Sequence, residues 1–215
     1  MLAFRKAIYT GCEGIELDVQ FSKDGKIVII HDEDVSRTTN GSGSVCDMSC
    51  AQLRELDAGR GERIPLLSEY FDMVEDLPIV TNIELKNNLI PYKGLEEMVL
   101  EMVRARVLSD RVIISSFNHE SVDKVKNLAP DILCGYICWG KLDGEGLAAR
   151  MCETGVEFVH PALSSLDSEF MESVRVNSLR ISVWTVNDAE SMRQLTELDV
   201  YGIFTDDPKN IRRHL

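Results

Sequence analysis

Short runs rich in β-branched residues alternate with helical segments along most of this chain, and the alternation constrains the fold more than any other feature. Strands joined by single helices of this length form a parallel sheet. The runs that qualify as parallel strands are 15–19, 82–85, 112–117, 132–137, 158–162, 181–186 and 202–206. We therefore predict an α/β fold of the (βα)8 TIM-barrel type, which needs eight such strands. Because the chain opens directly on a helix, we expect the missing strand to precede residue 1.

The chain has 215 residues, which suits a single barrel domain spanning 1–215. The predicted helices lie between the strands or before the first of them. They are 2–10, 50–57, 67–75, 94–107, 119–129, 145–154, 167–176 and 188–197. The one long irregular stretch, 33–66, is rich in Gly, Ser and Thr, and we interpret it as a small insertion over one end of the sheet.

The formal net charge of −13 argues against nucleic acid or an anionic membrane surface as a partner. The sequence contains no run of 18 apolar residues and no long apolar leader at its start, so we expect no stable membrane anchor and a cytoplasmic location. An anionic substrate would need a local positive centre in a protein of this charge.

The run at 26–31 follows a strand-like run so closely that a helix does not fit between them. Asp24 and Gly25 lie between the two runs, and Asp-Gly is a strong signal for a two-residue hairpin turn. With such a turn, Asp18 would lie directly opposite His31, with Cβ atoms about 5 Å apart.

Charged side chains repeat on one face of two of the predicted strands. Glu16 and Asp18 are two residues apart and so share a strand face, and Asn82, Glu84 and Lys86 repeat the spacing on the next parallel strand. Working residues of barrels lie at the carboxyl ends of strands. We therefore expect these side chains to form one cluster.

Three carboxylates without thiolates or clustered imidazoles are hard oxygen ligands, which suit Mg²⁺ or Ca²⁺ better than Zn²⁺. Glu16, Asp18 and Glu84 are therefore the predicted metal ligands, and a bound ion would polarise a phosphoryl oxygen. His31 is the candidate general acid or base, since imidazole titrates near neutral pH. Lys86 is placed to contact a phosphate oxygen.

At these residues the sequence resembles the glycerophosphodiester phosphodiesterase family, a branch of the phospholipase-C-like phosphodiesterase TIM barrels. The matching segments are collinear and cover nearly the whole chain. They are AFRKAI (3–8), GIELDVQFSKDG (14–25), VIIHD (28–32), RTTNGSG (37–43), LRELDAG (53–59), NIELK (82–86), ISSFNHE (114–120), VWTVND (183–188) and IFTDDP (203–208). The resemblance implies hydrolysis of a small-molecule glycerophosphodiester to sn-glycerol 3-phosphate and an alcohol.

The resemblance also implies roles for individual residues. A divalent metal would be held partly by Glu16, Asp18 and Glu84. His31 would be one of two catalytic histidines, Lys86 would lie near the phosphate, and Phe117 and Trp184 would wall the glycerol side.

The sequence departs from the family at its start. The family begins with a strand ending in His-Arg-Gly and a Pro-Glu-Asn-Thr loop, which carry the other catalytic histidine, a phosphate-binding arginine and a fourth metal ligand. Neither motif is present, so a strand and loop of roughly 15–25 residues are absent. Two interpretations stay open: a start placed at an internal methionine of a longer protein, or a homologue that lacks the strand.

Without that strand we expect the chain to be a poor phosphodiesterase with an open barrel edge, which would favour a homo-oligomer, poor solubility or filling by another segment. Two alternatives to the enzyme stay open: a non-catalytic phosphodiester- or metal-binding barrel, and a phosphodiesterase directed at lysophospholipids. His160 is interpreted as a histidine whose polar atoms are satisfied at a strand end.

Overall fold

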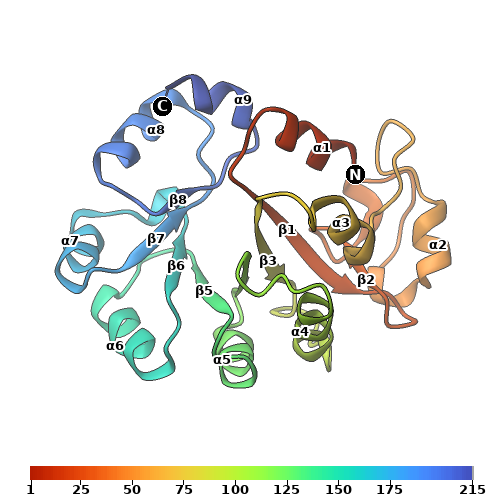
Figure 1. The fold of residues 1–215 in the computed structure, drawn as a ribbon, viewed down its shortest axis with the longest axis horizontal. Coiled ribbons are helices and arrows are strands. Elements are labelled where there is room, and N and C mark those ends of the chain that lie inside the picture. Colours follow the sequence, from red (N-terminus) through yellow and green to blue (C-terminus); the bar gives the residue numbers. More distant parts are fainter. Residues whose placement is uncertain (215) are drawn as a thin grey trace. The chain divides into compact units, whose positions relative to one another are not determined.

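Strands and helices alternate in the computed structural model, which describes residues 1–214 (Figure 1). The chain divides into two compact units, one spanning Met1–Ser116 and the other beginning at Phe117. No helix among residues 1–214 is both long enough and apolar enough to cross a membrane.

The first unit is built on a four-stranded sheet in the order β2-β1-β3-β4. Its strands are β1 (Gly14–Phe21), β2 (Ile27–Ile29), β3 (Val80–Leu85) and β4 (Val112–Ser116). Its helices are α1 (Leu2–Tyr9), α2 (Cys50–Glu55), α3 (Leu67–Val74) and α4 (Leu95–Ala105), with short 3-10 turns η1 (Val35–Arg37) and η2 (Val45–Asp47). The strands β1, β3 and β4 pair in parallel, and β2 pairs with β1 antiparallel.

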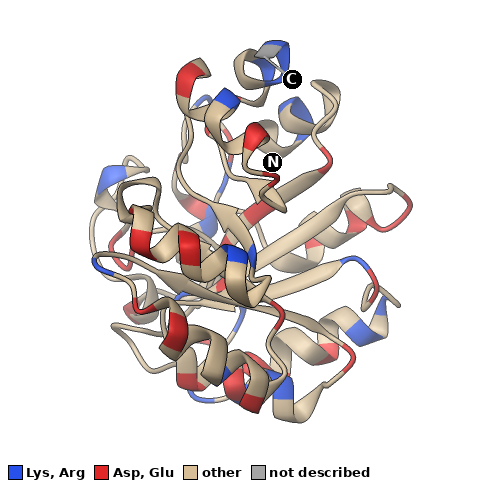
Figure 2. Cartoon of the chain, turned by 90° about the vertical axis from the view of Figure 1, so that its left-hand side faces the viewer, with Lys and Arg blue, Asp and Glu red and all other residues tan. Residues whose placement is uncertain are grey.

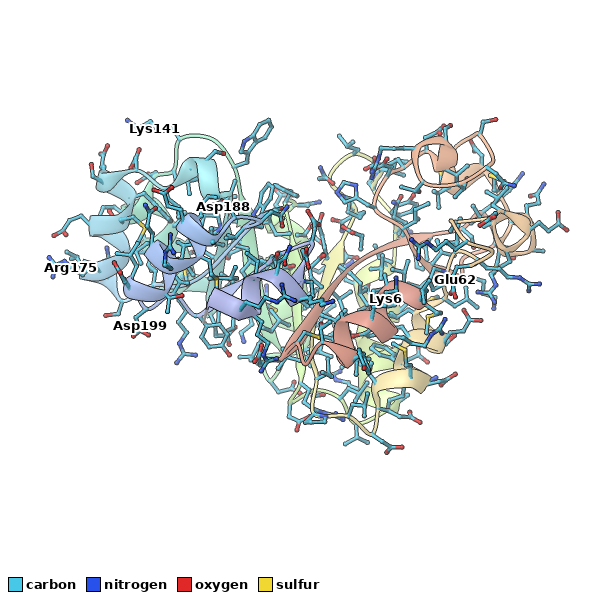
Figure 3. The ribbon with its side chains drawn as sticks, turned by 90° about the horizontal axis from the view of Figure 1, so that it is seen from above. Lys6, Glu62, Lys141, Arg175, Asp188 and Asp199 are labelled. Atoms are coloured by element: carbon cyan, nitrogen blue, oxygen red, sulfur yellow. The ribbon has the colours of Figure 1, made fainter. Side chains whose placement is uncertain are left out.

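Buried β-branched and leucine side chains hold this sheet to its helices. Leu17, Ile83 and Ile114 lie side by side on neighbouring strands and are at most 2% exposed. Helix α1 is tied to the loop before α3 by Glu62, which accepts hydrogen bonds from the Leu2 amide and the Arg5 guanidinium (Figure 3 labels Glu62). The stretch 33–66 packs against β2 and the residue after it through a small buried cluster, formed by Val28, Ile30, Val35, Val45, Leu53 and Ile64.

The β1–β2 hairpin corrects the predicted turn. Ser22 pairs with Lys26 across a three-residue connection, with Gly25 in the left-handed region at a φ of 73°. A turn followed by a left-handed residue is the usual form of three-residue hairpins, and the extra residue moves the register by one. The Ile30 amide therefore donates to the Asp18 carbonyl, and the prediction that His31 lies directly opposite Asp18 is wrong.

The second unit contains four parallel strands in the order β5-β6-β7-β8. They are β5 (Leu133–Cys138), β6 (Phe158–Pro161), β7 (Arg180–Val183) and β8 (Gly202–Ile203). Its helices are α5 (His119–Leu128), α6 (Gly144–Thr154), α7 (Ser168–Asn177), α8 (Ala189–Glu197) and α9 (Pro208–Ile211), with 3-10 turns η3 (Leu163–Ser165) and η4 (Arg212–His214). With β1, β3 and β4, these strands are the seven that the sequence predicts.

Each α-helix of the second unit begins after an Asn or Asp whose side chain accepts a backbone N–H of the first turn, as N-caps do. These residues are Asn118, Asp143, Asp167, Asp188 and Asp207. Asp188, labelled in Figure 3, accepts from the amides of both Glu190 and Ser191. Acidic and basic residues are interspersed along the helices (Figure 2), as in the Glu172–Arg175 ion pair of α7.

His160 on β6 lies in the core of the second unit and is 1% exposed. Its ring packs 5.2 Å from the Phe204 ring and closely over Gly135, where a Cβ atom would lie 2.8 Å from it. Neither ring nitrogen has a hydrogen-bond partner, so the prediction of a satisfied histidine is wrong. Burial lowers the pKa of His160 to about 3.

We predict that His160→Leu makes the free energy of unfolding less dependent on pH below about pH 6.5. The unfolded chain takes up a proton on this imidazole below about pH 6.5, whereas the folded chain does so only near pH 3. Wild-type stability should therefore fall through that window by about 1.4 kcal/mol per pH unit more than that of the variant. Urea unfolding between pH 6.5 and 4 measures the difference, and equal slopes for the two proteins would contradict it.

Candidate functional site

Three carboxylates meet on one face of the β1–β3 pair. One oxygen from each of Glu16, Asp18 and Glu84 lies within 4.8 Å of the other two. The parallel register places Asp18 opposite Glu84 and Glu16 opposite Asn82, which brings acidic side chains of adjacent strands to one face. The structure thus brings together the three residues that the sequence predicts as metal ligands.

The cluster is electrostatically costly as it stands. Burial, and then the neighbouring charge of Asp18, raise the pKa of Glu84 to about 7. Burial also raises the pKa of Asp18, although the charge of Lys86 opposes the shift. Carboxylates in this state favour any positive charge placed among them.

Lys86 supplies part of that charge. Its Nζ lies 3.1 Å from Glu84 Oε1 and 3.9 Å from Asp18 Oδ1. Burial works to lower the pKa of Lys86, but the charges of Glu84 and Asp18 outweigh burial and raise it. One ammonium group therefore does not balance three carboxylates.

The donor set fits a divalent ion. All three groups are hard carboxylate oxygens, which are the ligands that Mg²⁺ and Ca²⁺ prefer. Asn82 Oδ1, on the same strand face as Glu84, is a buried oxygen without a hydrogen-bond partner, and such an oxygen is costly unless something binds it. The site can therefore hold a divalent metal, and the assignment of these ligands stays a prediction.

His31 follows β2 and lies within electrostatic range of the cluster. When protonated, it lowers the pKa of both Asp18 and Glu84. Its side chain is 61% exposed, and its Nδ1 lies 2.6 Å from Asp32 Oδ1. An accessible imidazole beside an acidic cluster can exchange protons with a ligand bound there.

Gln20 is a residue of this region that the sequence reasoning missed. It is fully buried, and its Nε2 lies within hydrogen-bonding distance of the carbonyls of Ile30, His31 and Asp32. Its Oε1 accepts from the Tyr92 hydroxyl at 3.0 Å. A signal was present, because Gln20 continues the two-residue spacing of Glu16 and Asp18 along β1.

Phe117 and Trp184 belong to the second unit. Phe117 directly follows β4, the last strand of the first unit, and Trp184 directly follows β7. Their rings pack edge to face with centroids 5.7 Å apart. Such a pair offers an apolar surface of fixed shape. Their predicted contact with the glycerol portion of a substrate stays a prediction.

A family model described as the glycerophosphoryl diester phosphodiesterase family matches residues 1–210. A glycerophosphodiester phosphodiesterase of Caldanaerobacter subterraneus subsp. tengcongensis is 40% identical, over 97% of this chain and 88% of that protein. An Oleispira antarctica phosphodiesterase, solved in complex with the product sn-glycerol-3-phosphate, is 28% identical with a TM-score of 0.87, covering 97% of this chain and 87% of that one. A glycerophosphodiester phosphodiesterase of Thermotoga maritima is 29% identical with a TM-score of 0.83, covering 98% and 88% respectively.

These likenesses define an α/β protein of the TIM-barrel phosphodiesterase class, and they confirm the predicted fold class. The chain belongs to the glycerophosphodiester phosphodiesterase family. The carboxylate cluster is consistent with the metal dependence expected for that family.

We predict that Glu84→Gln weakens binding of Ca²⁺ and Mg²⁺ by roughly tenfold or more. The substitution keeps the shape of the side chain but removes the most buried charge of the cluster. Isothermal titration calorimetry of each ion on both proteins measures the change.

Glu55→Gln is the matched control, because Glu55 is an exposed residue of α2 and its substitution changes the net charge equally. The control should bind both ions as the wild type does. Equal affinity of Glu84→Gln and wild type would remove Glu84 from the ligand set.

Proposed function

We propose that this protein catalyses metal-dependent hydrolysis of glycerophosphodiesters to sn-glycerol 3-phosphate and an alcohol. The observation that supports the proposal most is the Glu16–Asp18–Glu84 cluster with Lys86 beside it, in a chain of this family. A relative of the same fold is known in complex with the product sn-glycerol-3-phosphate, which supports the same substrate class.

The reaction needs a local positive centre, because the substrate is an anion and the chain carries a net charge of −13. A divalent ion held by Glu16, Asp18 and Glu84 would supply Lewis-acid stabilisation of charge on the phosphoryl oxygens. Lys86, fixed by Glu84 and Asp18, would bind a phosphate oxygen and orient the diester.

Hydrolysis breaks the bond between phosphorus and the alcohol oxygen and forms one between phosphorus and a water oxygen. Two protons move: one leaves the attacking water, and one joins the departing alcohol. His31 lies within electrostatic range of the cluster, is open to solvent and carries an imidazole, which can both take up and release a proton. We assign it one of those two transfers.

Two alternatives remain. In a non-catalytic barrel, the cluster would bind metal and phosphodiester without turnover. In a lysophospholipid-directed enzyme, the chemistry would be the same and the leaving group would differ. Product analysis separates them, because sn-glycerol 3-phosphate is released only from glycerophosphodiesters and a non-catalytic barrel releases no product.

We predict that His31→Gln lowers kcat for glycerophosphocholine on the order of 10²- to 10⁴-fold, with KM little changed. Glutamine keeps the polarity and approximate size of the side chain but cannot carry the proton. An enzyme-coupled assay for sn-glycerol 3-phosphate, run with saturating Ca²⁺ or Mg²⁺, measures both constants.

His119→Gln serves as the control, since His119 lies on α5 of the second unit and contacts the Ile137 carbonyl. It should retain wild-type kcat. Unchanged kcat in His31→Gln would exclude the assigned proton transfer. Wild-type protein that binds Ca²⁺ and sn-glycerol 3-phosphate without turning over any diester would favour the non-catalytic barrel.

A further inference from the structure

Asp32 makes the contacts that hold the His31 imidazole. Its Oδ1 lies 2.6 Å from His31 Nδ1 and 2.8 Å from Arg37 Nη2, and its Oδ2 accepts from Arg37 Nε. The guanidinium of Arg37 thus engages both carboxylate oxygens, which is the strong bidentate form of an arginine–carboxylate pair. The ring of His31 is 61% exposed, so packing alone does not fix its orientation.

The protonation state of Asp32 determines which nitrogen of His31 carries the proton. The hydrogen bonds from Arg37, and then that from His31, hold the pKa of Asp32 well below its usual range. An ionised carboxylate can only accept hydrogen bonds, so His31 Nδ1 must be the donor. In the neutral imidazole, Nε2 is then the unprotonated nitrogen.

The backbone beneath the pair is fixed by a second set of contacts. The Gln20 amide gathers three successive carbonyls, those of Ile30, His31 and Asp32. The chain therefore bends around Gln20, and adjacent side chains that would diverge on a straight strand come into contact. Buried Tyr92 anchors Gln20 from the other side.

The RTTNGSG segment accounts for the position of Arg37. Arg37 ends the 3-10 turn η1, whose first residues are capped by Asp34 through the Ser36 amide. Thr39 closes the following turn by donating to the Val35 carbonyl. This segment places the Arg37 guanidinium against Asp32.

We propose that Asp32, held by Arg37, is a positioning residue that keeps His31 in the Nδ1–H tautomer and presents Nε2 for proton transfer. The proposal rests on the proposed function for its catalytic consequence. Asp32 takes up no proton in the reaction; the proton arrives at and leaves Nε2, while the Nδ1–H bond to Asp32 persists. Asp32 also stabilises the imidazolium that forms when Nε2 is protonated.

The direct test is the tautomer of His31. In protein labelled with ¹⁵N-histidine, long-range ¹H–¹⁵N spectra distinguish protonated from unprotonated ring nitrogens, and a pH series identifies the conditions in which the ring is neutral. The spectrum of His31→Gln identifies the His31 signals by their loss. We expect protonated Nδ1 and unprotonated Nε2 in the wild type, and loss of that preference in Asp32→Ala.

The kinetic arm uses Asp32→Asn, which keeps the shape of the side chain but removes its charge. We expect kcat to fall by about 10- to 100-fold with KM changed by less than about threefold, because the groups that bind the diester are untouched. Asp47→Asn is the matched control: Asp47 is an exposed residue of η2 in the same 33–66 stretch, so the variant changes the charge equally and should alter neither the tautomer nor kcat. Circular dichroism of all variants confirms that they fold.

Arg37 provides an independent check. Arg37→Ala should lower kcat, and Arg37→Lys should restore only part of it, because lysine cannot make the bidentate contact. In the double variant Arg37→Ala/Asp32→Asn, kcat should fall by much less than the product of the two single decreases, since Arg37 acts through Asp32. Decreases that multiply in the double variant would contradict the inference that Arg37 acts through Asp32.

The two proposals fail in different ways. A wild-type His31 in the Nε2–H form, or an unchanged tautomer in Asp32→Ala, would overturn the positioning role even if the protein hydrolyses its substrate. A wild type that hydrolyses no glycerophosphodiester, but whose Nδ1–H tautomer depends on Asp32, would overturn the function and leave the positioning role standing.

Discussion

Like charges on Glu16, Asp18 and Glu84 repel one another, and the parallel β1–β3 register nevertheless keeps their oxygens within 4.8 Å. Burial adds to the cost, as the pKa of about 7 at Glu84 shows. The backbone hydrogen bonds of two buried strands and the ammonium of Lys86 hold the cluster together. A cation that entered this arrangement would recover the energy stored in it, so the cluster can serve as a metal-binding site.

Much of the architecture follows from local sequence. Alternating apolar runs mark the seven parallel strands, and Asn or Asp before an apolar helix marks the starts of α5 to α8. The hairpin register could not be predicted from the sequence, because Asp24-Gly25 fits both two- and three-residue turns. Only the hydrogen bonds between Ser22 and Lys26 distinguish the two. Helix α9 was also missed, since four residues after Asp207 are too few to show a helical period.

Some parts of the candidate site could likewise be predicted from local sequence, and others could not. The carboxylates and Lys86 were predictable because two-residue spacing on adjacent strands places them on one face whatever the loops do. The contacts that hold His31 could not be predicted, because they depend on a bend at residues 31–33 and on Arg37, which belongs to the separate turn η1. For His160 the sequence predicted hydrogen-bond partners that the structure does not show, since sequence pattern does not reveal whether a buried imidazole has one.

The central claim is that the carboxylate cluster holds the divalent ion of this protein. Anomalous diffraction from crystals soaked in Mn²⁺, an ion that accepts the same oxygen ligands as Mg²⁺ and Ca²⁺, locates the metal directly. We predict a single strong anomalous peak in contact with carboxylate oxygens of Glu16, Asp18 and Glu84. A Mn²⁺ peak elsewhere, with none at these three residues, would contradict the account.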